Sequence, residues 1–250
     1  MQISLLMIII VILWLVPALL DHLTGKFIYV VVAALVAIIA HGIYFFGPHI
    51  LYLLLITYVI STVAELVALK TPINCFGVRY WYNIKNPFFS SKVNYLGVYP
   101  LEISLAWVIF KYMSFILALL ITSAFSLSPP WIIVLTPLIL VSLDFIIDPV
   151  SVHTGKLWQW EKGSFYFGIP LRNFLGWYVV GFISTLLFTL IDQGKPVTFH
   201  ILYVLPILFY ASVLKRVPAM MKLNRRLAIL GSLPVVFWVG LGLVSLYTLI

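Results

Sequence analysis

Long apolar stretches separated by short polar segments run along the whole chain. Each stretch is close to the ~20 residues that an α-helix needs to cross about 30 Å of hydrocarbon. The stretches are uninterrupted, whereas strands of a membrane β-barrel alternate polar and apolar residues. We therefore predict an all-α fold, a polytopic transmembrane bundle of about eight spans. The predicted spans are Ile3–Leu20, Phe27–Phe46, Ile50–Leu69, Leu101–Ala124, Trp131–Ile147, Phe174–Ile191, Phe199–Leu214 and Ala228–Leu249.

Composition agrees with this pattern and excludes an ordinary soluble domain. The chain is 64% hydrophobic and 9% charged, whereas soluble domains are about 25% charged. Its 250 residues leave no room for a soluble domain beside the helices, so we expect one membrane domain, 1–250. The segment Met1–Leu20 lacks a positive n-region and is predicted to be a retained span. The single cysteine, Cys75, excludes an intrachain disulfide and cannot form a zinc site alone.

The distribution of Lys and Arg predicts an orientation. Thirteen of the fifteen basic residues follow the odd-numbered spans, whereas Lys195 is alone on the other side and Lys111 lies inside the fourth span. By the positive-inside bias, the odd-numbered loops are cytoplasmic and both termini are extracytoplasmic. We expect a multi-pass protein of the cytoplasmic membrane. Because the basic residues are scattered through loops, the net charge of +8 indicates topology and contact with anionic lipid, and no nucleic acid.

Acidic residues gather on the predicted cytoplasmic side, which the positive-inside bias does not explain. Asp144 and Asp148 are four residues apart and project from one helix face. Asp144 and Glu65 lie about one turn inside their apolar stretches, where ionisable groups are costly and usually face a bundle interior or a wet cavity. For Lys111 we expect a buried pairing with a carboxylate that holds the bundle together. The six acids on this side are Asp21, Glu65, Glu102, Asp144, Asp148 and Glu161.

Two predicted cytoplasmic loops, about 70–100 and 148–173, are long and rich in aromatic residues. Both end in the same pattern, since Pro100 to Trp107 matches Pro170 to Trp177 in spacing. Proline is favoured at the start of a helix, where its missing amide donor costs nothing. The pattern indicates a weak parallel repeat. Interfacial aromatic residues often form only an anchoring belt, but the fixed Gly and Pro positions favour folded loops that cap a cavity.

At these loops the sequence resembles the carotenoid biosynthesis family of membrane proteins, which includes carotenoid 1,2-hydratases and bacterioruberin-pathway hydratases. The second loop carries the more specific block of residues. They are Asp148-Pro149, Trp158-Gln159-Trp160-Glu161, Gly163, Tyr166 to Leu171 and Asn173 to Trp177. The first loop contributes Phe76-Gly77, Tyr80, Tyr82, Gly97-Val98, Pro100-Leu101 and Ala106-Trp107.

The resemblance implies an enzyme that adds water across the terminal double bond of an acyclic carotenoid, giving a tertiary alcohol. Such a reaction needs a proton donor, a pocket that tolerates a tertiary carbocation, and one admitted water. An apolar setting or a neighbouring carboxylate keeps a carboxylic acid protonated, and aromatic ring faces stabilise a cation. No metal or organic cofactor is required. The expected partners are the long apolar carotenoid, water, membrane lipid and other carotenoid enzymes.

Within this hypothesis the acid is Asp144 or Asp148, and the other aspartate or Glu161 positions the water. Glu65 and Glu102 are the next candidates for catalysis, and Asn173 is a polar positioning group. The remaining candidates are aromatic residues expected to contact the substrate. They are Tyr80, Tyr82, Trp107, Trp158, Trp160, Tyr166, Phe167 and Trp177.

Three other functions fit parts of the pattern. A membrane prenyltransferase binds diphosphate through magnesium held by two aspartate-rich motifs, but the chain offers only Asp144 and Asp148 as one such motif. A transporter or proton pathway would use the intramembrane Glu65, Asp144 and Lys111. The repeat here is centred on interfacial loops and no broken helices lie at mid-membrane, which argues against that class. A non-catalytic subunit that organises carotenoid enzymes is the third.

Overall fold

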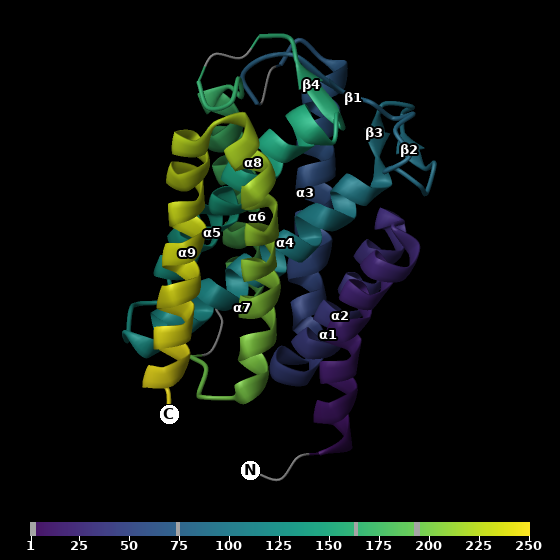
Figure 1. Ribbon diagram of the computed structural model, residues 1–250. Coiled ribbons are helices and arrows are strands. Elements are labelled where there is room, and N and C mark those ends of the chain that lie inside the picture. The colour runs from purple at the N-terminus through teal and green to yellow at the C-terminus, as the bar shows by residue number, and fades with distance from the viewer. Residues whose placement is uncertain (1–3, 74–75, 163–164, 193–195) are drawn as a thin grey trace.

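A computed structural model describes residues 4–73, 76–162, 165–192 and 196–250 (Figure 1). Ile3, Cys75, Gly163 and Lys195, on which some of the expectations above rest, lie outside the described residues. The helices are α1 (Leu5–Thr24), α2 (Phe27–Phe46), α3 (Ile50–Lys70), α4 (Leu101–Ala124), α5 (Trp131–Pro149), α6 (Leu171–Ile191), α7 (Val204–Ala211), α8 (Val217–Leu223) and α9 (Arg225–Thr248). Short helical turns link some of them, η1 (Gly47–His49), η2 (Val150–Thr154), η3 (Ile201–Tyr203) and η4 (Ser212–Arg216).

The structure confirms an all-α bundle of membrane-spanning helices. Among the described residues, seven continuous helical stretches are long and apolar enough to cross a membrane, and one of them, Phe27–Lys70, contains both α2 and α3. The chain turns between these two helices at Gly47, whose φ is +69°. A side chain at Gly42 would meet Ile50, which a straight helix would hold about 12 Å away. This turn accounts for the difference from the predicted count of eight.

Both chain ends and both long loops follow the alternation that the charge pattern predicts. The start of α1 and the end of α9 lie at one end of the bundle, and the loops that carry β1 and β4 lie at the other (Figure 1). This arrangement is the one expected for an even number of crossings. Which end faces the cytoplasm stays a prediction from the positive-inside bias.

Several boundaries differ from the predicted ones. Helical structure runs from Ile201 through Leu223, so Lys215, Arg216 and Lys222 lie in helical turns, whereas the sequence placed them in a loop. Long basic side chains can keep their charge at an interface while the helix continues. The helical segment ends only at Asn224, whose side chain accepts a hydrogen bond from the Leu227 amide and caps α9. Helix α5 likewise continues past Ile147 through Asp148, which the sequence assigned to the loop.

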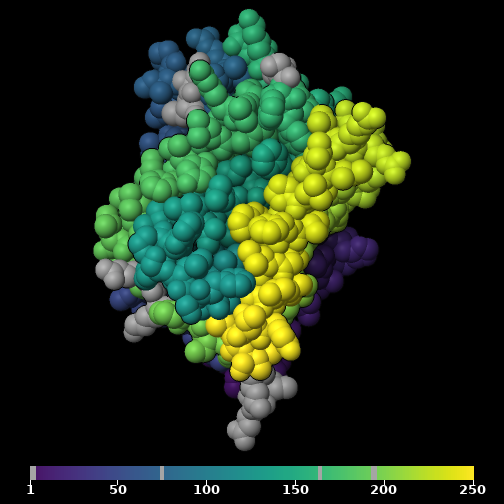
Figure 2. Space-filling model, turned by 90° about the vertical axis from the view of Figure 1, so that its left-hand side faces the viewer, coloured from purple at the N-terminus to yellow at the C-terminus, as the bar shows by residue number. Residues whose placement is uncertain are grey.

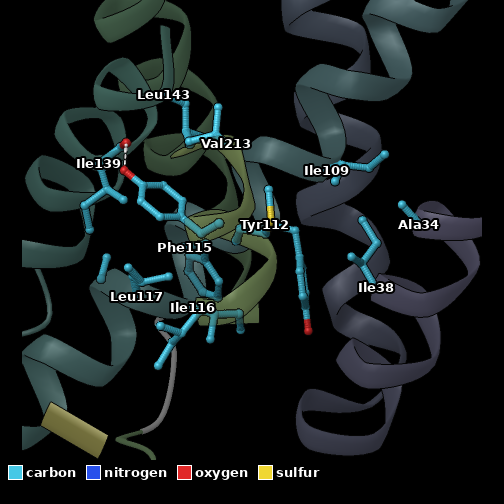
Figure 3. Packing of buried hydrophobic residues seen from close by; sticks show 14 of the residues in the cluster. Ala34, Ile38, Ile109, Tyr112, Phe115, Ile116, Leu117, Ile139, Leu143 and Val213 are labelled. Carbon is cyan, nitrogen blue, oxygen red and sulfur yellow. Dashed lines mark hydrogen bonds between the residues drawn. The ribbon is translucent and has the colours of Figure 1, made fainter. Parts of the chain in front are cut away.

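Helix α4 is the centre of the bundle. It packs against α2, α3, α5, α7 and α9, and most of its side chains are buried. Figure 3 shows Tyr112, Phe115 and Ile116 of α4 between Ile139 of α5 on one side and Ile38 of α2 on the other. The outer helices expose apolar side chains such as Leu55, Leu190 and Phe237, as expected for surfaces that contact lipid.

The two aromatic loops pair with each other through short strands. Strand β1 (Tyr80–Tyr82) of the first loop pairs antiparallel with β4 (Trp158–Trp160) of the second. A second pair, β2 (Asn94–Tyr95) with β3 (Tyr99–Pro100), lies within the first loop. Pro100 and Pro170 directly precede α4 and α6 as their N-cap residues. The loops are therefore folded against each other over one end of the bundle, as the Gly and Pro positions indicated.

Lys111 is buried in α4, but the expected carboxylate partner is wrong. Its ammonium group donates to three oxygens of α6, namely Gly181 O, Ser184 Oγ at 2.8 Å and Thr185 Oγ1. Neither ion pair found among the described residues involves Lys111. Three acceptors match the three N–H bonds of an ammonium group. The lysine therefore ties α4 to α6 through hydroxyl and carbonyl oxygens.

We expect Lys111→Met to leave the bundle folded, with less than about 1.5 kcal/mol of lost stability. The two hydroxyls remain satisfied, because Ser184 also donates to Val180 O and Thr185 donates to Gly181 O. Removing a buried charge also removes its desolvation cost. Thermal unfolding in detergent measures the effect. Lys111→Ala, which leaves a cavity, should destabilise more; a larger loss for the methionine variant would contradict this account.

Candidate functional site

One large cavity lies under the paired loops and reaches into the bundle. It has an empty volume of about 1250 Å³, including its open part. Apolar residues of α4 and α5, such as Phe110 and Leu143, form part of its wall, and two further groups of residues complete it. The first group is polar and aromatic and lies toward the loops, comprising Glu65, Phe76, Tyr80, Tyr82, Trp107, Asp148, Trp158, Trp160, Asn173 and Trp177. The second lies on α2 and along α7–η4 and includes Phe27, Val30, Val31, Ala34, Phe209, Tyr210, Val213, Lys215 and Arg216.

Asp148 projects into this cavity from the last turn of α5. Its Oδ1 accepts a hydrogen bond from Trp158 Nε1 at 2.9 Å, and its Oδ2 accepts one from Asn173 Nδ2 at 2.7 Å. The same amide nitrogen donates to Asp144 Oδ2, also at 2.7 Å. The predicted shared face of Asp144 and Asp148 is thus confirmed, and Asn173 of α6 joins the pair. Only Asp148 lines the cavity, while Asp144 lies one turn deeper.

Glu65 is a second carboxyl group on the same cavity and comes from α3. Its Oε2 accepts hydrogen bonds from the hydroxyls of Tyr80 and Tyr82, the latter at 3.1 Å, and its Oε1 accepts one from Trp107 Nε1 at 3.2 Å. Burial and then the neighbouring Glu65 raise the pKa of Tyr82 well above its usual value. The Tyr82 phenol therefore stays protonated and donates a hydrogen bond to Glu65.

Aromatic rings cover the space between the two acids. Trp107 of α4 and Trp177 of α6 stack with their ring centroids 4.0 Å apart and an interplanar angle of 26°. The ring of Tyr80 lies 4.8 Å from that of Trp160, and the ring of Tyr82 lies 5.6 Å from that of Trp158. These side chains alternate with outward ones along β1 and β4, since Trp81 is 49% exposed. The strand pairing therefore directs four rings inward.

Of the fourteen predicted site residues, nine line the cavity and the other five do not. The nine that line the cavity are Glu65, Tyr80, Tyr82, Trp107, Asp148, Trp158, Trp160, Asn173 and Trp177. Asp144 reaches the cavity only through Asn173, as described above. Glu161 is exposed at the surface after β4 and does not line the cavity. Glu102 is buried away from the cavity and accepts from the Ser91 amide at 2.7 Å.

Tyr166 and Phe167 are also placed differently from the expectation. They do not line the cavity. Tyr166 donates to Phe145 O at 2.9 Å and packs toward α9, where a side chain at Gly231 would collide with its hydroxyl. Positive φ angles at Phe167 and Gly168 turn the chain here. This local reversal leaves the two rings outside the wall of the cavity, although they lie close to Asn173 in sequence.

The apolar wall contributed by α2 and α7–η4 was missed in the sequence. Val30, Ala34 and Phe209 lie in ordinary spans whose hydropathy shows no special feature. Only the packing of α2 beside α4 places them opposite the loops. At the edge of this wall, exposed Lys215 forms an ion pair with Asp21 of α1, with Nζ and Oδ2 3.2 Å apart.

Among the described residues, no three His, Cys, Asp or Glu side chains lie close enough together to form a metal site.

Comparison with known proteins then identifies a relationship. The family described as carotenoid biosynthesis protein matches residues 24–245, which include α2 to α8, most of α9 and both aromatic loops. No curated protein and no solved structure matches the chain.

Proposed function

Because this chain belongs to the family of carotenoid biosynthesis proteins, we propose that it hydrates the terminal double bond of an acyclic carotenoid to a tertiary alcohol. The observation that carries the proposal is a buried carboxyl group, Asp148, at the wall of a cavity that is lined mostly by aromatic and aliphatic side chains. An acid of this kind can protonate an alkene, and the surroundings suit an apolar substrate.

Asp148 is the proton donor in this proposal. It lies four residues from Asp144, and one amide, that of Asn173, donates to both carboxyl groups. Two adjacent buried carboxyl groups hold at least one proton between them, because both cannot be charged without a strong repulsion. Of the two aspartates, Asp148 lines the cavity and can therefore deliver the proton to a substrate there. Asn173 holds both carboxyl groups in place through its hydrogen bonds.

The carbocation formed by protonation would be surrounded by ring faces. Trp107 and Trp177 are stacked, and Tyr80 lies against Trp160, so π-systems line the same cavity as the acid. A cation over an aromatic face is stabilised by about 0.5–2 kcal/mol per ring, more where water is excluded.

The remaining part of the cavity suits the polyene. Its walls on α2 and α7 are aliphatic or aromatic, as at Val30, Ala34 and Phe209. A conjugated chain has no polar groups and gains free energy from burial at about 25 cal/mol per Å² of apolar surface. The end group would therefore lie at Asp148 and the chain along α2.

Expression in a lycopene-producing bacterial host tests the proposal. We expect a new pigment heavier than lycopene by one water, or by two if both ends react, with a tertiary hydroxyl group. Hosts that carry an empty vector give the baseline, and chelation of magnesium should leave the conversion unchanged. An unaltered pigment profile, with the protein present in the membrane fraction, would contradict the proposed substrate and reaction.

A further inference from the structure

The two halves of the site are related by an approximate twofold arrangement. Helices α3–α4 and α5–α6 with their loops each contribute an acid near the end of the first helix, one strand of the β1–β4 pair, an N-cap proline and one cavity tryptophan on the second helix. In β1 and β4, Tyr80 pairs with Trp160 and Tyr82 with Trp158, so the central pair is Trp81 with Gln159. An antiparallel pairing of this kind maps each strand onto the other by a half-turn about its centre.

This relation identifies the counterpart of Asp148. The half-turn places Tyr80 at the position of Trp158, and these two side chains donate to Glu65 and Asp148, respectively. Trp107 corresponds to Trp177, and the two rings stack against each other. Glu65 is therefore equivalent to Asp148, and both acids line the same cavity.

The two acids differ in their surroundings. One turn before Asp148 lies Asp144, whereas one turn before Glu65 lies Ser61. Asp148 shares its amide donor with another carboxyl group. Glu65 has no such neighbour in its own half and accepts from three donors, those of Tyr80, Tyr82 and Trp107. Burial opposes a charge on Glu65, and the three hydrogen bonds offset part of that cost because each stabilises the negative charge of the carboxylate.

We propose that Glu65 is the second catalytic residue of the hydration, the base that receives a proton from the attacking water. The inference rests on the proposed function. Asp148 transfers its proton to the less substituted alkene carbon, and the π electrons form the new C–H bond. Water then forms the C–O bond to the tertiary cation, and its proton passes to Glu65. The sum is alkene plus water giving alcohol, and transfer of the proton from Glu65 back to Asp148 through water restores the site.

Separate roles for the acids predict separable defects. Without the base, Asp148 can still protonate the alkene, and the resulting cation returns a proton from a neighbouring carbon to the Asp148 carboxylate. In D2O this cycle leaves deuterium in recovered alkene without forming an alcohol. We therefore expect Glu65→Gln to reduce hydration about 100-fold while deuterium incorporation continues. Asp148→Asn should lose both activities.

The experiment uses purified full-length protein in detergent or lipid, with lycopene as substrate in D2O. Glu102→Gln is the matched control, because Glu102 is equally buried but lies outside the cavity; it should retain both activities. If Glu65→Gln does not fold, Glu65→Asp replaces it and should give a smaller loss of hydration with exchange retained. Hydration by Glu65→Gln within threefold of the unmodified protein would overturn the assignment, as would joint loss of hydration and exchange in a folded variant. An unmodified protein that neither hydrates nor exchanges would instead refute the proposed function.

Discussion

Replacing Asp148 with asparagine should reduce alcohol formation by about 1000-fold or more, because the proton donor is removed. Asparagine is nearly isosteric, and its oxygen can still accept from Trp158 Nε1. Its NH2 group then faces Asn173, whose amide can flip to present its oxygen, so the wall of the cavity keeps its shape. The loss should therefore appear in kcat with little change in the amount of folded protein. Product analysis by mass spectrometry and size-exclusion chromatography of the same preparation measure both quantities.

Asp144→Asn is the matched control for this variant. Asp144 shares the Asn173 amide with Asp148 but does not line the cavity. Its replacement removes a neighbouring charge and leaves the donor in place, so we expect a loss of about tenfold or less. If the asparagine at 144 were the more damaging of the two, the deeper aspartate would be the acid and the present assignment would be wrong.

Gly231→Ala should destabilise the bundle by about 1–3 kcal/mol, the usual cost of overpacking. A Cβ at this position would overlap the Tyr166 hydroxyl, which donates to Phe145 O and Leu227 O. Helix α9 lies along α5 on the face shown in Figure 2, so displacing Tyr166 disturbs the contact between these helices. Thermal unfolding in detergent should show a lower midpoint.

Gly240→Ala provides the matched control in the same helix. No atom lies within 4 Å of a Cβ at this position. Alanine is the better helix former by about 0.5–1 kcal/mol, so this variant should be neutral or slightly more stable. Equal stability of the two variants would show that Tyr166 does not occupy the space beside Gly231.

Hydropathy was sufficient to predict the bundle, because each span must satisfy its own backbone hydrogen bonds inside lipid. It predicted less well where a helix continues past basic residues, as at Lys215 and Arg216, since charge alone does not end a helix. The partner of Lys111 was also wrong. A carboxylate is the usual partner expected for a buried lysine, but hydroxyl oxygens on α6 accept hydrogen bonds from the ammonium group instead.

The site was predictable where local pattern and three-dimensional position agree. Aromatic residues at alternate positions in two loops, such as Tyr80 and Trp160, meet because the loops pair as strands. The sequence could not separate Asp144 from Asp148, which share a helix face and differ only in depth. It also misplaced Tyr166, because the positive φ angles that turn the chain after it leave little trace in composition.

The β1–β4 pairing has a consequence for how the roof of the cavity can be assembled. Each half of the chain supplies one strand, so neither half alone can close the space above the acids. A chain with only one helix pair and its loop would need a second copy of itself, related by a rotation axis through the strand centre, to build the same roof. The present chain carries both halves covalently linked, so the two halves need not be identical: one has Glu65 alone and the other has Asp148 paired with Asp144.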